Sequence, residues 1–329
     1  MGRGDNRRPH EKRRVKEVKV PAAFDPLLVS IVAVWALNIS LIKMALVEFP
    51  PLAFNILRLA IAAVVLMSAL YAKEKNVRIA RQDVPKILLL SFTGYALSQS
   101  LVIMGIHLTS ATNVAVLSGT SPIVISLLSS FFKHDRISPV GWLGVALGFI
   151  GVYIVISGRA GGFHFSDRTL KGDVLVFLAI CLWAHYSVSA RPLVKVYSPL
   201  KFSAVTISLG TLFSLPFSYS SLKALPGAAI SVRSWGLLAF AGVVPMAVGL
   251  IIWLNSVRRV GNSQTAVYSN LQPVLAIVFA HLLLKDAVGG GLAAGAALVL
   301  VGIYLTRRGR RAVTETASAP RQASSDTEP

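Results

Sequence analysis

The sequence predicts an all-α membrane protein with ten transmembrane helices, arranged as two inverted five-helix repeats. Three observations lead to this prediction. The 329 residues are 54% hydrophobic and only 14% charged, whereas soluble domains carry about 25% charged residues. Ten apolar windows are long enough to cross a membrane. The two halves of the chain also match each other at a nearly constant offset.

The net charge of +19 raises the question of nucleic-acid binding, but the distribution of the charge argues against it. Eight Lys or Arg residues lie within residues 1–25, five follow residue 306, and most of the others occupy short breaks between apolar runs. Basic clusters beside membrane helices are typical cytoplasmic anchors. We therefore expect the basic tails to bind anionic membrane lipids, and we expect no nucleic acid as a partner.

A membrane helix needs about 20 mostly apolar residues. Ten windows meet this requirement: 26–47, 51–72, 85–106, 109–132, 138–158, 172–192, 199–219, 233–256, 262–284 and 287–306. With both termini on one side, that side receives 25 of the 33 Lys and Arg residues, and the opposite side receives six. This asymmetry follows the positive-inside rule. It predicts a multi-pass protein of the inner (plasma) membrane with both termini in the cytoplasm.

An internal repeat supports the same architecture. The matches include Trp35 with Trp183 and Lys43 with Arg191 at an offset of 148, and Pro122 with Pro273 and Gly151 with Gly302 at an offset of 151. Each repeat holds an odd number of spans, so the second repeat enters the membrane upside down, as in many secondary transporters. The predicted units are a basic cytoplasmic tail (1–25), a first repeat (26–158), a linker loop (159–171), a second repeat (172–306) and a disordered cytoplasmic tail (307–329).

Four stretches carry a resemblance to a known family. They are residues 35–43 (WALNISLIK), residues 50–58 (PPLAFNILR), the segment 109–138 around Pro122, and the segment 260–286 around Pro273. On these stretches the chain resembles the EamA-type transporters of the drug/metabolite transporter superfamily, over residues 27–306. Where the family usually has Gly-Glu, this chain has His134-Asp135 and Lys285-Asp286, which keeps the carboxylate. The resemblance implies a ten-helix, exporter-like carrier of small polar metabolites, amino acids among them.

Two cations, Lys43 and Arg58, fall inside predicted spans. A charge at the middle of the bilayer costs about 2.5–3.5 kcal/mol on insertion scales, so it needs a reason to be there. Lys43 is close enough to the end of its span to reach the interface, and Arg58 could pair with a carbonyl or with Glu48. A cation that faces a cavity would instead attract a carboxylate or a phosphate. We include both among the substrate-binding candidates.

Polar side chains recur at helical spacing within several spans. Ser91, Tyr95 and Gln99 share a face of the third span, and Gln264, Tyr268 and Gln272 share a face of the ninth. Such residues often form hydrogen bonds between helices, but stripes that combine amides with aromatic rings favour a cavity lining. The substrate-binding candidates are Trp35, Asn38, Lys43, Arg58, Tyr95, Gln99, Asn113, His185, Tyr186, Gln264 and Tyr268.

One histidine and two prolines within the predicted spans have both a structural and a functional interpretation. His185 lies deep in the sixth span beside Trp183 and Tyr186, where a lone histidine is more often a packing residue than a proton carrier. Pro122 and Pro273 are expected in mid-helix, where each would kink its helix. Their symmetric placement indicates either shape alone or a pair of hinges for alternating access.

The predicted function is that of a secondary transporter, an exporter or exchanger of small polar metabolites such as amino acids. Lys43 and Arg58 would suit a phosphorylated or anionic metabolite instead, such as a sugar phosphate or nucleotide sugar. A non-transporting membrane scaffold is an alternative from another class. No catalytic motif, metal-ligand set or cofactor loop is visible, and the single Cys181 excludes an intramolecular disulfide. An enzyme, a metal and a cofactor are therefore not expected, and a homodimer is left open.

Overall fold

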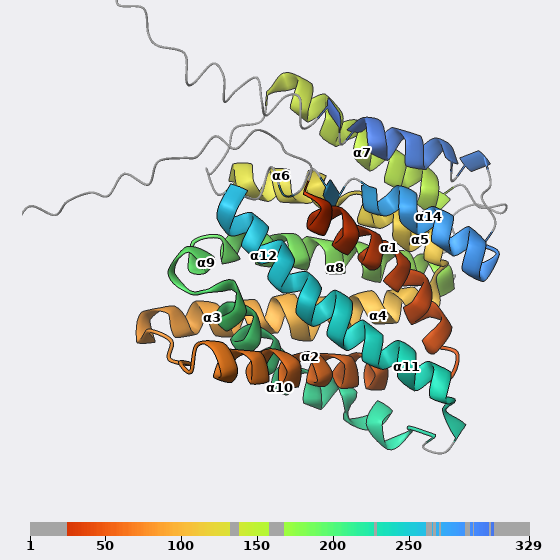
Figure 1. Cartoon of the computed structure of the whole chain (residues 1–329). Coiled ribbons are helices and arrows are strands. Elements are labelled where there is room, and N and C mark those ends of the chain that lie inside the picture. Colours follow the sequence, from red (N-terminus) through yellow and green to blue (C-terminus); the bar gives the residue numbers. More distant parts are fainter. Residues whose placement is uncertain are drawn as a thin grey trace, which may run out of the picture.

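The structure is a computed structural model of the whole chain. It describes residues 25–131, 138–157, 168–226, 229–260, 265, 268–269, 271–286, 290–291, 293–302 and 304–305. Within these residues every regular element is a helix (Figure 1). Nearly all of both predicted tails, most of the predicted linker and the candidate residue Gln264 lie outside the described residues.

The helices of the first half follow one another with short breaks. They are α1 (Pro26–Ala45), α2 (Pro51–Lys73), a long third helix made of η1 (Arg81–Asp83), α3 (Val84–Ser91), η2 (Phe92–Leu97) and α4 (Ser98–Leu108), then α5 (Ala111–Ser118), α6 (Ser121–Phe131) and α7 (Pro139–Ser157). The second half has the same succession. Its helices are α8 (Arg168–Ala190), α9 (Leu193–Val196), α10 (Pro199–Lys223), a long helix made of α11 (Val232–Ala241), η4 (Gly242–Val248) and α12 (Gly249–Val260), then α14 (Leu271–Leu284) and a last helix, Ala293–Gly302.

Six of the described helices are long and apolar enough to cross a membrane, and four shorter apolar helices accompany them. Each of these helices overlaps one of the ten windows expected from the sequence. The prediction of an all-helical chain with several membrane-length apolar segments is therefore confirmed. Helix α8 begins at Arg168, four residues before its predicted span. The ten-span inverted repeat itself stays a prediction.

Local sequence explains where several helices begin. Asp25 accepts hydrogen bonds from the backbone N–H groups of Leu27 and Leu28, and a proline follows it at the first helical position. Ser110 caps α5 and Ser198 caps α10 in the same way, each through the N–H three residues ahead. A side-chain oxygen at this position satisfies a donor that the helix leaves open, and proline at the first position has no donor to lose.

The two long interrupted helices carry the same irregularity. A π-helical turn, η2, begins at Phe92, and a second one, η4, begins at Gly242. The two turns are 150 residues apart, which lies between the repeat offsets of 148 and 151 residues. Such turns are rare and occur frequently at functional sites. Each turn inserts an extra residue, so the residues after it are rotated relative to a regular helix. The helices that follow, α4 and α12, both line the cavity described below.

The expectation of mid-helix prolines is wrong for Pro122. Helix α5 ends at Ser118, a turn at Gly119 and Thr120 follows, and Pro122 is the second residue of α6. For Pro273, in α14, the mid-helix expectation stays a prediction. In the first turn of a helix, proline removes no intrahelical hydrogen bond. The turn at Gly119 and Thr120, rather than a proline kink, therefore interrupts the predicted fourth span.

The two halves pack against each other along several helix pairs. Helix α2 packs on α10, α1 on α14, and α4 on α8, and Figure 1 shows α2 beside α10 on one flank and α7 beside the last helix on the other. Helix α7 and the last helix meet at glycines. A Cβ on Gly151 would lie 2.7 Å from the Gly295 carbonyl oxygen, and one on Gly302 would lie 2.6 Å from that of Gly144. This contact is reciprocal between repeat mates, which is the pattern that a two-fold relation produces.

We expect Gly302→Ala to destabilise the protein by about 1–3 kcal/mol, because its Cβ would meet backbone atoms that cannot move aside. Gly236→Ala is the matched control, since nothing lies within 4 Å of a Cβ at that helical position. Alanine favours a helix over glycine by about 1 kcal/mol, so the control is expected to be neutral or stabilising. Thermal unfolding of the purified protein in detergent measures both changes. Equal melting temperatures for the two variants would contradict the close helix crossing.

For the description of the site, we name the two ends of the helix bundle. The N-terminal end holds residues 25, 74–83 and 191–198, and the far end holds residues 46–50, 109–110 and 285–286. Helix α1 runs from the first end to the second, and α8, its repeat mate, runs in the opposite direction.

Candidate functional site

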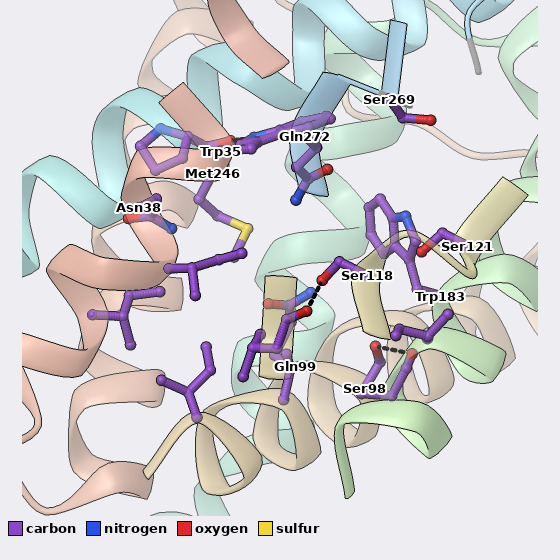
Figure 2. Close-up of a pocket in the computed structure, with 18 of the residues that line it drawn as sticks. Trp35, Asn38, Ser98, Gln99, Ser118, Ser121, Trp183, Met246, Ser269 and Gln272 are labelled. Atoms are coloured by element: carbon purple, nitrogen blue, oxygen red, sulfur yellow. Dashed lines mark hydrogen bonds between the residues drawn. The ribbon is translucent and has the colours of Figure 1, made fainter. Parts of the chain in front are cut away.

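A cavity of about 210 Å³ lies between the two halves. It is lined by α1, α2, α4, α5 and α6 of the first half and by α8, α11, η4, α12 and α14 of the second. Most of the lining is apolar. Its polar and aromatic members are Trp35, Asn38, Arg58, Ser98, Gln99, Ser118, Ser121, Trp183, Trp253, Ser269 and Gln272. Figure 2 shows Trp35, Gln272, Gln99 and Trp183 around one shared space.

Two tryptophans that are repeat mates both border this cavity. Trp35 of α1 donates a hydrogen bond from Nε1 to the Pro245 carbonyl oxygen of η4, at 2.8 Å. Its ring lies 5.3 Å from that of Trp253. Trp183 of α8 stacks on Tyr186, with ring centroids 5.2 Å apart and an interplanar angle of 25°. The prediction that Trp35 lines a cavity agrees with this placement, and Trp183 is a lining residue that the candidate set omitted.

Tyr95 and Tyr186 are fully buried behind Trp183 and are not among the cavity-lining residues. Their hydroxyl groups form a hydrogen bond at 3.1 Å, and their rings meet edge to face at 5.2 Å. Tyr95 lies inside η2, whereas Gln99 follows it. The extra residue of the π-helical turn separates the faces of Tyr95 and Gln99, which explains why only Gln99 lines the cavity.

Arg58 reaches the cavity from α2 although its side chain is only 3% exposed. One guanidinium nitrogen, Nη2, donates to the side-chain oxygens of Asn55 and Gln99, both at 2.9 Å. Glu48, the carboxylate considered as its partner, instead accepts hydrogen bonds from Ser231. Asn38 of α1 also borders the cavity, and its enclosed Oδ1 atom accepts no hydrogen bond from the described part of the chain.

Lys43 is not among the cavity-lining residues. Its ammonium group donates to three backbone carbonyls at the end of α4, those of Ile106 (2.8 Å), His107 (3.1 Å) and Thr109 (2.6 Å). These carbonyls have no partner within their own helix, and a cation at this end is favoured by the helix dipole. All three ammonium donors are thus used to tie α1 to α4 at the far end, which supports a structural role for Lys43.

Asn113, another candidate, joins a buried cluster at the far end rather than the cavity lining. Its amide nitrogen donates to both carboxylate oxygens of Asp173, each at 3.2 Å, and the Thr109 hydroxyl donates to the same carboxylate at 2.5 Å. Asp173 is fully buried in α8. The sequence-based analysis missed this residue, although the 148-residue offset matches it with Asp25. The cluster connects the two halves, because Thr109 and Asn113 belong to the first and Asp173 to the second.

Two further hydrogen-bonded contacts connect the halves at the far end. The backbone N–H and hydroxyl of Thr112 donate to Asp286, at 3.2 and 3.0 Å. The Ser231 N–H and hydroxyl donate to Glu48, at 2.6 and 2.9 Å. Together with the cluster around Asp173, these contacts join the two halves at the far end of the bundle.

The N-terminal end has its own contacts between halves. The Asp25 N–H donates to the Tyr268 hydroxyl at 3.2 Å, so Tyr268 lies beside the start of α1 and not among the cavity-lining residues. Gln272, one turn further along the same stripe, lines the cavity. The Tyr197 hydroxyl donates to Asp83 at 2.5 Å. His185 is half-buried and is not among the lining residues either.

Two of these contacts are expected to respond to pH in opposite directions. The Ser231 N–H lowers the pKa of Glu48, so the Glu48 contact contributes stability above the ordinary glutamate pKa and loses it as pH falls through the lowered value. The hydrogen bond to Asp83 raises the pKa of Tyr197, so this contact is complete below the ordinary tyrosine pKa and is lost as pH rises through the raised value.

Melting temperatures across a pH series measure this dependence. At neutral pH the melting temperature of the wild-type protein is expected to be higher than that of Glu48→Gln. This difference in melting temperature is expected to shrink below about pH 4. The difference in melting temperature between the wild type and Tyr197→Phe is expected to shrink above about pH 10. A difference that stays constant over the series, for either variant, would show that the corresponding contact does not titrate.

Comparisons with known proteins agree with this arrangement. The model of the EamA-like transporter family matches residues 24–157 and again residues 170–308. The chain is 26% identical over 265 residues to "Uncharacterized transporter YetK" of Bacillus subtilis, covering 80% of each chain. It is 27% identical over 298 residues to "Probable terminal-alkyne amino-acid exporter" of Streptantibioticus cattleyicolor, covering 88% of this chain and 96% of the relative.

A further relative and a solved structure extend the comparison. The chain is 27% identical over 300 residues to "Probable amino-acid metabolite efflux pump" of Escherichia coli, covering 87% of this chain and 95% of that protein. One crystal structure is similar in fold, with a TM-score of 0.65 and 19% identity, over 87% of this chain and 97% of the other. The family model covers both halves almost completely, and on this evidence the chain belongs to the EamA-like transporter family.

Proposed function

We propose that this transporter moves small polar metabolites such as amino acids through the cavity between its halves, as an exporter or exchanger working by alternating access. The observation that carries the proposal is the lining of the cavity, to which both halves contribute a tryptophan and an amide side chain. Binding pockets for drug-sized ligands span about 300–1,000 Å³, so a cavity of about 210 Å³ favours a small solute over a nucleotide sugar.

The proposal includes ten membrane spans in two inverted repeats, in an inner membrane with both termini in the cytoplasm. Three features support it: the matching π-helical turns at an offset of 150 residues, the reciprocal glycine contacts of α7 with the last helix, and the antiparallel directions of α1 and α8. With this orientation, the N-terminal end faces the cytoplasm. The far end faces the opposite side, where fewer basic residues lie.

The contacts between the halves at each end would serve as two alternating gates. The far gate consists of Asp173 with Thr109 and Asn113, and the near gate pairs Asp25 with Tyr268. Asp173 and Asp25 are repeat mates, although the near contact uses the backbone N–H of Asp25, and rocking of one repeat against the other would open one gate at a time. In this structure the contacts of both gates are formed, so it corresponds to a state from which either gate would open.

The names of two relatives, an amino-acid exporter and an amino-acid metabolite efflux pump, favour amino acids as the first substrates to test. The test loads proteoliposomes with a radiolabelled mixture of amino acids, and parallel vesicles with sugar phosphates, and follows efflux. We expect protein-dependent efflux of at least one amino acid, with saturation at high concentration. Efflux of neither class, from vesicles in which the folded protein is present in both orientations, would contradict the proposal.

A further inference from the structure

The guanidinium of Arg58 is a buried charge without an ionic partner in the described part of the chain. Its side chain is 97% enclosed, and its hydrogen-bond partners are the neutral side-chain oxygens of Asn55 and Gln99. The Nε atom is enclosed and has no hydrogen-bond partner among the residues that the structure describes. A buried charge is normally paired, because taking it out of water without a counter-ion is costly. This arrangement therefore lacks an anion.

The surroundings of Arg58 hold its guanidinium in place. Asn55, one turn earlier on α2, donates from Nδ2 to the Ser100 hydroxyl at 3.2 Å, and that hydroxyl donates to the Ala96 carbonyl at 2.6 Å. Gln99, the second acceptor, comes from α4 and lines the cavity itself. Two helices thus hold the guanidinium in position before any solute arrives. Binding then loses less side-chain conformational entropy.

A second unsatisfied group borders the same cavity. Asn38 of α1 is 9% exposed, and no donor for its Oδ1 atom is found within the described segments. A solute that satisfies both groups needs an anionic oxygen for Arg58 and an N–H or O–H donor for Asn38. Neither group is satisfied by the other, because both Nη2 contacts of Arg58 go to Asn55 and Gln99.

Resting on the proposed transport function, we propose that Arg58 and Asn38 form a two-point subsite for a small monocarboxylate that also carries a hydrogen-bond donor, the chemistry of an α-amino acid. Arg58 binds the carboxylate, Asn38 accepts from the ammonium group, and the rest of the solute lies against Trp35 and Trp183. Among the lining residues Arg58 is the single charged side chain. One cation matches one carboxylate better than a phosphate monoester, which carries a charge of about −1.5 to −2.

The test uses the purified full-length protein and matched pairs of probes. Thermal stabilisation is measured with alanine, leucine and phenylalanine, with the three corresponding amides, and with glycerol 3-phosphate. Ligand binding raises the melting temperature by mass action. We expect at least one amino acid to stabilise the wild-type protein, and we expect its amide and glycerol 3-phosphate to have little effect at the same concentration.

The variants separate charge from geometry. Arg58→Gln is expected to weaken amino-acid binding about 100-fold, because a buried charge-assisted contact is lost. Arg58→Lys keeps the charge but lacks the planar fork, and is expected to weaken it about tenfold. Asn38→Ala is expected to narrow the preference of the protein for the amino acid over the corresponding desamino carboxylate. Arg258→Gln, at an exposed site on α12, removes one positive charge away from the cavity and serves as the control.

The melting temperature of ligand-free Arg58→Gln distinguishes a binding role from a structural role, because the two roles predict changes in opposite directions. If Arg58 is kept for binding, ligand-free Arg58→Gln is expected to melt at the wild-type temperature or above it, since an uncompensated buried charge is gone. A lower melting temperature together with unchanged binding would make Arg58 a structural residue and overturn the subsite.

Two further outcomes distinguish this inference from the proposed function. Amides or glycerol 3-phosphate that bind as well as amino acids, or the absence of any stabilisation by the carboxylates, overturn the subsite. Saturable efflux of a solute without a carboxylate from proteoliposomes would leave the transport function standing and refute the subsite alone. Absence of all efflux would refute the transport function itself.

Discussion

Asp173→Ala is expected to lower the stability of the protein by about 3 kcal/mol or more, because Thr109 and Asn113 would lose hydrogen bonds to a buried carboxylate. The cavity would remain, since none of the three residues lines it. The far end, however, would lose the contact that joins α8 to the start of the fourth span. We therefore expect faster leakage of a preloaded solute from proteoliposomes as well as a lower melting temperature.

The repeat supplies a matched comparison for this variant. Asp25→Ala changes the equivalent position of the other half, where the carboxylate caps α1 and is only half-buried. Loss of a helix cap costs about 1 kcal/mol, so this variant is expected to be the milder of the two. Asp173→Asn keeps the side-chain volume and one acceptor and is expected to fall between Asp173→Ala and the wild type. Equal effects of both alanine variants would argue against a specific role of the buried carboxylate.

Trp35→Ala is expected to reduce the initial rate of amino-acid efflux about 10–100-fold, because it removes about 1.5–3 kcal/mol of apolar contact with the solute. It also leaves the Pro245 carbonyl without the hydrogen bond that the indole donates. Trp35→Phe keeps an aromatic ring but loses that bond and part of the indole surface, so its rate is expected to fall less than that of Trp35→Ala, to within about tenfold of the wild type.

Trp142 provides the control for a general effect of losing an indole. Its side chain is 53% exposed on α7, which contributes nothing to the cavity lining. Trp142→Ala is expected to leave the efflux rate unchanged. If Trp142→Ala and Trp35→Ala reduce the rate equally, the position of Trp35 at the cavity has no special role in transport.

The sequence was sufficient to predict the helical class and several of the cavity residues. Apolar length alone located the membrane-length helices, and the 148-residue offset matched Trp35 with Trp183, which both line the cavity. Helical periodicity put Asn38 on the same face of α1 as Trp35, and both residues line the cavity; their role in substrate binding stays a prediction. These successes depend only on length and on a constant 3.6-residue period.

Several other candidates do not line the cavity, for identifiable physical reasons. Tyr95 was assigned to the face of Gln99 by a regular period, but the π-helical turn that contains Tyr95 changes that period. Lys43 and Asn113 are polar residues inside apolar spans, and their partners are backbone carbonyls and Asp173, which are distant in sequence. A single sequence shows that a polar group needs a partner, but it does not show which neighbouring helix supplies one.

The central claim is that the cavity between the halves is open to each side of the membrane in turn. The single native cysteine makes a direct test simple. In a Cys181→Ser background, Gln272→Cys places one thiol on α14 at the cavity. A membrane-impermeant maleimide is then applied from either side, and Val47→Cys, 84% exposed at the far end, serves as the one-sided control.

We predict that the thiol at position 272 reacts from both sides, and that a transported amino acid slows the reaction from both. The control thiol at position 47 is predicted to react from the non-cytoplasmic side alone. Reaction at position 272 from one side only, with or without substrate, would contradict alternating access through this cavity.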